Sequence, residues 1–153
     1  MNNAFSEEVI IGLRRQYPGL ELIFDENEHR EFSSFDYAFN NPDRLYKLKI
    51  KNKGMISIPD SIDIFTRLQS ISLPGNKLNR LPESIANIEF LKSLNLERNS
   101  FCAIPPIIGQ VKYLQNLNVA GNAISEIPEF ISDLQYLKII ELTNNKIFSI
   151  PQC

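Results

Sequence analysis

Four lysines alternate along one short stretch of the chain, and they are the side chains best suited to bind an anionic partner. They occupy every second position of the sequence LYKLKIKNK, namely Lys47, Lys49, Lys51 and Lys53. Residues two apart lie on the same face of a β-strand, so the spacing predicts a strand with one cationic face. Such a face could contact phosphate groups or an acidic protein. We expect it instead to protect an exposed sheet edge, because lysine discourages pairing with other chains.

The other residues capable of chemistry are few and poorly spaced for it. The chain has one histidine, His29, and two cysteines, Cys102 and Cys153, which match no metal-binding or redox spacing. The loop around His29 alternates possible oxygen ligands somewhat like a calcium loop, but Arg30 stands where that loop needs glycine. No phosphate-binding or dinucleotide motif occurs. We therefore expect no enzyme, no cofactor and no metal site.

The composition argues against broad electrostatic binding. The 153 residues carry 16 Lys and Arg against 18 Asp and Glu, a net charge of −2, and 43% of them are hydrophobic. This balance is typical of a one-domain globular protein and offers no general attraction for nucleic acid or acidic lipid. No apolar run approaches the roughly 18 residues of a membrane span, and the N-terminus lacks a signal-peptide pattern. We expect a cytoplasmic protein with no nucleic-acid or membrane partner.

From residue 45 onward the sequence repeats with a period of 23 residues. Within each repeat, apolar residues recur at the first, fourth and sixth positions, and a later isoleucine or leucine precedes a proline, as in Ile104-Pro105. One such unit cannot bury its apolar face alone, so neighbouring units must stack. The five repeats begin at Leu45, Leu68, Leu91, Leu114 and Leu137, and the last one is incomplete.

The pattern L-x-x-L-x-L-x-x-N-x-L-x-x-L-P-x-x-I resembles the leucine-rich repeat. The 23-residue length with "LP" or "IP" is similar to the subclass found in plant intracellular Ras-group proteins and bacterial repeat proteins, and it covers residues 45–153. The resemblance implies an α/β repeat solenoid, a right-handed coil with a concave parallel sheet of about five strands. It also implies a protein-interaction module, which could be bacterial and even an effector delivered into a host cell. A structural subunit or fragment of a larger assembly is the alternative.

One position of the repeat carries asparagine four times, at Asn76, Asn99, Asn122 and Asn145, while Lys53 stands there in the first repeat. An amide at this turn can bond backbone groups that would otherwise lack partners. The resemblance implies that these asparagines form a buried ladder. A row of amides that binds a ligand is the less favoured interpretation.

The outward strand positions define the predicted binding face. Asparagine and serine are poor strand formers, so their presence there favours hydrogen bonding to another polypeptide, although they could be merely solvated. The face grades from cationic, through small and amide-bearing side chains, to mixed residues with an acid. The residues expected to contact the partner are Lys47, Lys49, Ser72, Asn95, Glu97, Arg98, Asn118, Glu141 and Thr143.

The two ends of the chain depart from the repeat. Residues 1–44 predict an N-terminal cap made of a helix over 6–17, a strand over 20–24 and a helix over 33–40, with a small separate module as the alternative. The last repeat stops after 17 of its 23 positions, beside the apolar strand 139–143. That pattern predicts self-association through the C-terminal edge, unless the natural protein is longer.

Overall fold

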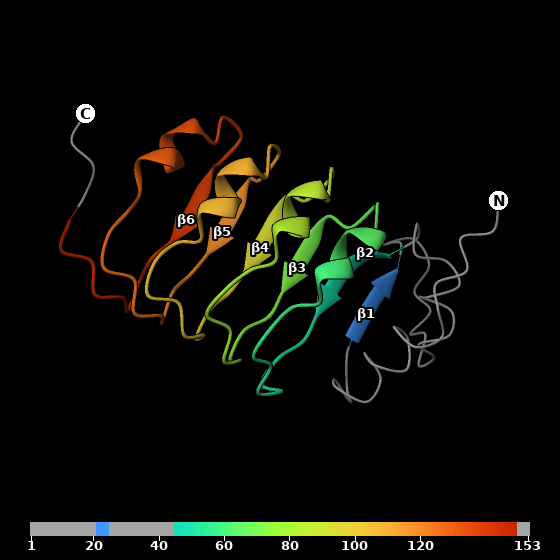
Figure 1. The fold of residues 1–153 in the computed structure, drawn as a ribbon, viewed down its shortest axis with the longest axis horizontal. Helices are drawn as coiled ribbons and strands as arrows, with labels where there is room; N and C mark the ends of the chain where they lie inside the picture. Colours follow the sequence, from blue (N-terminus) through green and yellow to red (C-terminus); the bar gives the residue numbers. More distant parts are fainter. Residues whose placement is uncertain (1–20, 25–44, 150–153) are drawn as a thin grey trace.

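The computed structural model describes residues 21–24 and 45–149, and it shows six strands side by side in one sheet (Figure 1). The order of the strands in the sheet follows the order of the chain, and β2 to β6 are parallel. The α/β repeat solenoid with five parallel strands is therefore confirmed. The strands are β1 Glu21–Phe24, β2 Leu45–Lys49, β3 Ser70–Ser72, β4 Ser93–Asn95, β5 Asn116–Asn118 and β6 Ile139–Glu141.

The register between neighbouring strands equals the repeat length. Ser70 lies opposite Ser93, and Ser93 lies opposite Asn116, each 23 residues further along the chain. The backbone continues to pair after the strands end, since the N–H of Leu73 donates to the Asn95 carbonyl and that of Gly75 to the Glu97 carbonyl, both at 2.8 Å. Each turn of the coil is thus tied to the next over more residues than the short strands alone.

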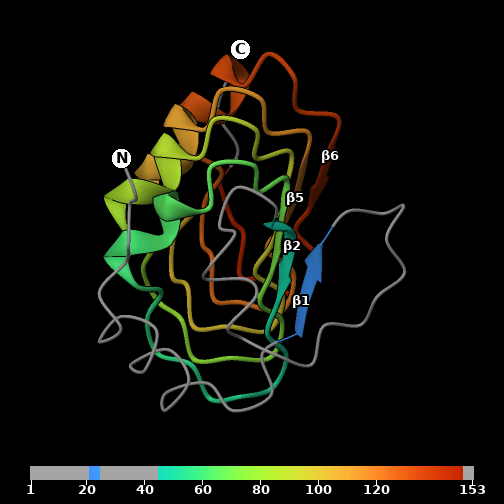
Figure 2. The same cartoon turned by 90° about the vertical axis from the view of Figure 1, so that its right-hand side faces the viewer.

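Short 3-10 helices run along the side of the coil opposite the sheet (Figure 2). Each begins directly after the repeated proline, whose ring fixes φ and lacks an N–H, so it suits a helix start. In η4, the N–H of Ile108 donates to the carbonyl of Pro105 at 3.0 Å. The helices are η2 Asp60–Ile64, η3 Glu83–Asn87, η4 Pro106–Gln110 and η5 Glu129–Asp133.

The core lies between the sheet and the 3-10 helices and consists of the repeated apolar positions. The first residue of four repeats is wholly buried, and Phe101 fills the centre at 1% exposure. Toward the last repeat the same positions become half-buried: Leu137, Ile140 and Leu142 pack against the core but are only partly covered. The wholly buried first residues are Leu45, Leu68, Leu91 and Leu114.

The lysine-rich strand β2 does not lie at the edge of the sheet. Strand β1 pairs with it antiparallel, and Leu22 lies opposite Leu48. The expectation that the lysines protect an exposed edge is therefore wrong for β2. The N-terminal helices expected over residues 6–17 and 33–40, together with His29 and Cys153, lie outside the described residues.

Candidate functional site

The outward side chains of strands β2 to β6 form a polar surface, here called the sheet face. The strand register arranges them in two rows that run across the strands. Inward residues between them, such as Leu94, are buried, so the strands expose only these rows. One row is Lys47, Ser70, Ser93, Asn116 and Ile139, and the other is Lys49, Ser72, Asn95, Asn118 and Glu141.

The two central asparagines of the sheet face are held by their own strands. The N–H of Glu97 donates to Oδ1 of Asn95 at 2.9 Å, and the N–H of Ala120 donates to Oδ1 of Asn118 at 3.0 Å. Short amide side chains readily bond the backbone two residues on. The sequence predicted that these amides bond another polypeptide, whereas their oxygens already accept hydrogen bonds within the chain. Their Nδ2 groups donate no hydrogen bond within residues 21–24 and 45–149.

Charge is unevenly distributed over the sheet face. Lys47 and Lys49 lie on β2, where both also have interaction partners, and Glu141 lies exposed on β6. Between them, Nε of Arg98 lies 3.3 Å from Oε1 of Glu97. The Arg98 side chain is 78% exposed, so this ion pair adds little stability, but it cancels two charges locally.

One residue of every turn adopts a left-handed backbone conformation just after the strand. Arg98 has φ of 52°, and Asn144, which follows Thr143, has φ of 57°. The corresponding Gly75 and Gly121 have φ of 68° and 67°, and Asn52 has φ of 55°. The turn therefore exposes a large side chain in some repeats and glycine in others.

The repeated asparagines bind the backbone beneath this turn. Nδ2 of Asn99 donates to the carbonyls of Leu73 and Leu96, both at 2.9 Å, and Oδ1 accepts from the N–H of Leu78 at 3.0 Å. Asn122 and Asn145 repeat the pattern one and two turns later. Each amide thus links its own turn to the preceding one.

The first repeat has lysine in place of this asparagine, yet its backbone is bonded in the same way. The N–H groups of Lys53 and Met55 donate to Oδ1 of Asn76 at 3.0 and 3.2 Å. Asn76 is 7% exposed and also donates to the Ile50 carbonyl at 2.8 Å. The asparagine of the second repeat therefore serves the first repeat as well.

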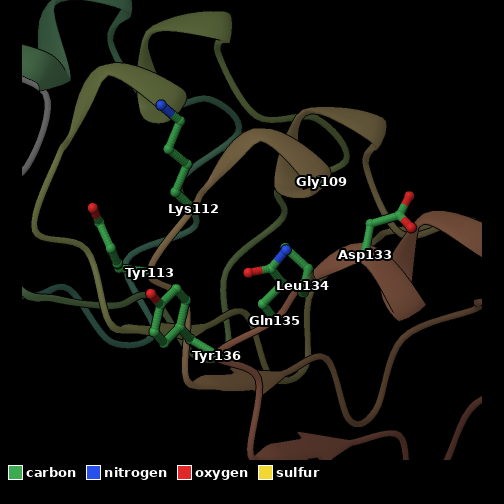
Figure 3. A pocket seen from close by; sticks show the side chains of 7 residues that line it. All are labelled: Gly109, Lys112, Tyr113, Asp133, Leu134, Gln135 and Tyr136. Atoms are coloured by element: carbon green, nitrogen blue, oxygen red, sulfur yellow. The ribbon is translucent and has the colours of Figure 1, made fainter.

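A cleft between residues 109–113 and residues 133–136 of the next turn was not anticipated from the sequence. Tyr113 and Tyr136 lie beside each other with ring centroids 5.3 Å apart (Figure 3). They belong to an open cleft of about 280 Å³ that also includes Lys112 and Asp133. Aromatic residues every 23 positions, at Phe90 and at the two tyrosines, are the sequence signal that would have revealed it.

The described residues provide neither a metal-binding cluster nor a membrane-spanning helix. Within residues 21–24 and 45–149, no group of three or more His, Cys, Asp or Glu side chains could hold a metal ion. Cys102 is an exposed free thiol. Over the same residues, none of the helices has the length and apolar character needed to cross a membrane.

A family model described as Leucine Rich Repeat matches residues 113–134. The chain is similar to the ectodomain of the Arabidopsis thaliana receptor kinase GASSHO1/SCHENGEN3 in complex with CASPARIAN STRIP INTEGRITY FACTOR 2, with 32% identity and a TM-score of 0.58. That match covers 67% of this chain and 13% of the other. No curated protein matches the chain by sequence.

Two further solved structures show the same likeness. A leucine-rich repeat protein of Leptospira interrogans has 29% identity and a TM-score of 0.60, with 78% of this chain and 36% of that chain covered. The BIR3–SERK2 complex from Arabidopsis thaliana has 26% identity and a TM-score of 0.53, with 71% and 58% covered. The chain thus spans less than two thirds of each of these structures. With its 23-residue stacked turns and the matching family model, this chain is a leucine-rich repeat protein.

Proposed function

We propose that the protein binds a polypeptide partner through the sheet face. The observation that carries this proposal is the pair of polar rows on β2 to β6, where asparagine and serine replace good strand formers. Leucine-rich repeat relatives have been seen in complexes, including the ectodomain bound to CASPARIAN STRIP INTEGRITY FACTOR 2. Such complexes support a protein-interaction module in general, and domains of this kind are generally not enzymes.

The binding residues of this proposal are the outward side chains named from the sequence. Lys47, Ser72 and Glu141 lie in the two rows, and Arg98 and Thr143 lie at or next to the turn that follows the strands. A cytoplasmic location and a bacterial source belong to the same proposal and rest on the sequence pattern.

The proposal can be tested without a known partner. The full chain is immobilised and used to select binders from a random-peptide display library, and the affinity of the enriched peptides is measured by titration calorimetry. Ser93→Arg with Asn116→Arg places two large cations in the centre of the sheet face. Neither Ser93 nor Asn116 has a side-chain hydrogen bond within residues 21–24 and 45–149. We expect binding to weaken at least about tenfold.

The matched control places the same charges on the opposite side of the coil. Gln110→Arg with Ser132→Arg changes two exposed residues of η4 and η5 and, like the sheet-face variant, adds two positive charges. This variant should bind like the unchanged protein, and both variants should keep the urea midpoint. Equal affinity of the sheet-face variant and the unchanged protein would contradict the proposal.

Self-association through the C-terminal edge is a second proposal. Ile139 on β6 is 53% exposed, and the neighbouring Ile140 and Leu142 are half-buried. Apolar side chains beside a strand edge favour association with another chain. The effect of Ile140→Lys on the oligomeric state tests this proposal.

A further inference from the structure

We propose that the partner segment is an extended polypeptide of about six residues that crosses the strands with its acidic and basic residues in a fixed order. Its acidic end lies over β2, backbone carbonyls and other acceptors lie over β3 to β5, and a basic residue lies over β6. This inference rests on the proposed function and adds the chemistry and the direction of the segment. Three features of the sheet face support it.

The centre of the sheet face donates hydrogen bonds. Asn95 and Asn118 lie opposite each other in the register, and each uses Oδ1 to accept a backbone N–H of its own strand. This bond fixes which end of the carboxamide turns inward, so the Nδ2 groups face the partner. A segment over them must offer acceptors, which an extended backbone does through its carbonyls.

The two ends of the sheet face carry opposite charge. Lys47 and Lys49 occupy the β2 end of both rows, and each also has an interaction partner within the protein. At the other end Glu141 lies on β6, with Lys138 three residues before it. The rows themselves therefore run from two lysines to one carboxylate. A partner with the reverse order of charges is attracted electrostatically at both ends of the rows.

The length of the rows sets the length of the segment. Four strand spacings of about 4.8 Å separate β2 from β6, or about 19 Å in all. An extended chain advances about 3.3 Å per residue, so about six residues cover this distance. Ile139 lies beside Glu141 and is 53% exposed, so the residue over β6 also meets an apolar surface. The aliphatic stem of lysine or arginine suits such a place.

A selection experiment with charge variants tests the direction. The immobilised full chain selects from a random decapeptide display library, in parallel with Lys47→Glu plus Lys49→Glu and with Glu141→Lys. Peptides enriched on the unchanged chain should carry acidic and basic residues about five positions apart. The lysine variant should replace the acidic preference with a basic one, and Glu141→Lys should alter only the other end. Peptides selected on the unchanged chain should bind each variant about tenfold more weakly.

The outcomes separate this inference from the proposed function. If enriched peptides lack the charge order, or keep it on both charge variants, while Ser93→Arg with Asn116→Arg still abolishes binding, the direction is wrong and the sheet face remains the binding surface. If the arginine variant binds normally, the proposed function fails, and this inference fails with it. A library that yields no enriched peptide overturns both.

Discussion

Replacing Asn122 with leucine should destabilise the protein strongly, because its carboxamide bonds four backbone groups. The carboxamide of Asn122 donates to the carbonyls of Val119, Leu96 and Ala120 at 2.8, 3.1 and 3.3 Å. Its oxygen accepts the N–H of Phe101 at 3.1 Å. Leucine has nearly the same size but none of these bonds, so Asn122→Leu removes the hydrogen bonding and keeps most of the packing.

The expected loss follows from how deeply these backbone groups lie. Leu96 and Val119 are 0% exposed and Phe101 is 1% exposed, so water reaches their backbone groups poorly. A buried polar group left without a partner costs about 1–3 kcal/mol. With two or more such groups affected, we expect a loss of about 3 kcal/mol in the free energy of unfolding. At a urea dependence of about 2 kcal/mol per molar, the midpoint falls by about 1.5 M.

Urea unfolding followed by circular dichroism and by tyrosine fluorescence measures this loss, and coincident curves justify a two-state fit. Asn116→Leu is the control, since Asn116 is half-buried on the sheet face and leucine is the better strand former there. Asn145→Leu should cost less than Asn122→Leu, because Leu142 beside it is only half-buried. A midpoint for Asn122→Leu equal to that of Asn116→Leu would refute the structural role of the ladder.

Three other predictions concern the turns, the thiols and the edge. Gly54→Ala and Gly75→Ala both place a Cβ on a residue with φ of 68°, so each should lower the free energy of unfolding by about 1 kcal/mol. Gly75→Ala should lower it further, because only its new Cβ collides with the Asn52 side chain. Equal urea midpoints for the two would argue against that contact. Cys102 should react with a thiol reagent without denaturant, and both cysteines should react in denaturant without reductant; fewer than two reactive thiols would show that the repeat register is wrong. Ile140→Lys should shift a dimer toward monomer in sedimentation, whereas an unchanged protein that stays monomeric up to high micromolar concentration would exclude the edge contact.

The repeat itself was predictable because its signals are local and occur five times. Leucine or isoleucine at two alternate positions predicts a strand, as at Leu94 and Leu96. Both are buried in the core, Leu94 within β4 and Leu96 directly after it. The repeated proline predicts where the extended segment of each repeat ends, and η4 begins directly after Pro105. Period and proline together therefore place the strands, the core and the outward rows.

Other features depend on contacts between distant residues, which a periodic pattern does not contain. The segment LELIF predicts a strand, but its antiparallel pairing with β2 joins distant residues, and the segment's own sequence does not contain that information. The contact of Tyr113 with Tyr136 depends on the distance between neighbouring turns. The orientation of the Asn95 amide depends on which carbonyls the neighbouring strand leaves available.

That last dependence links the asparagine ladder to the sheet face. In a regular parallel ladder the N–H of Glu97 would donate to the carbonyl of Leu73. The Leu73 carbonyl instead accepts from Nδ2 of Asn76 at 3.0 Å and of Asn99 at 2.9 Å. The N–H of Glu97 therefore turns to Oδ1 of Asn95 within its own strand.

The same hydrogen-bond pattern recurs one repeat later. The Leu96 carbonyl accepts from the next two ladder asparagines, and the N–H of Ala120 donates to Asn118. In the second repeat, proline at position 74 has no N–H to satisfy, and Ser72 stands where the third and fourth repeats have asparagine. Asparagine thus occupies this position in the third and fourth repeats, where the ladder displaces the turn N–H. The fifth repeat has Glu141 there, although the Val119 carbonyl likewise accepts from Asn122 and Asn145. The same bond that completes the turn directs the amide N–H groups outward, so the internal hydrogen bonding of the coil determines what its surface can offer to a partner.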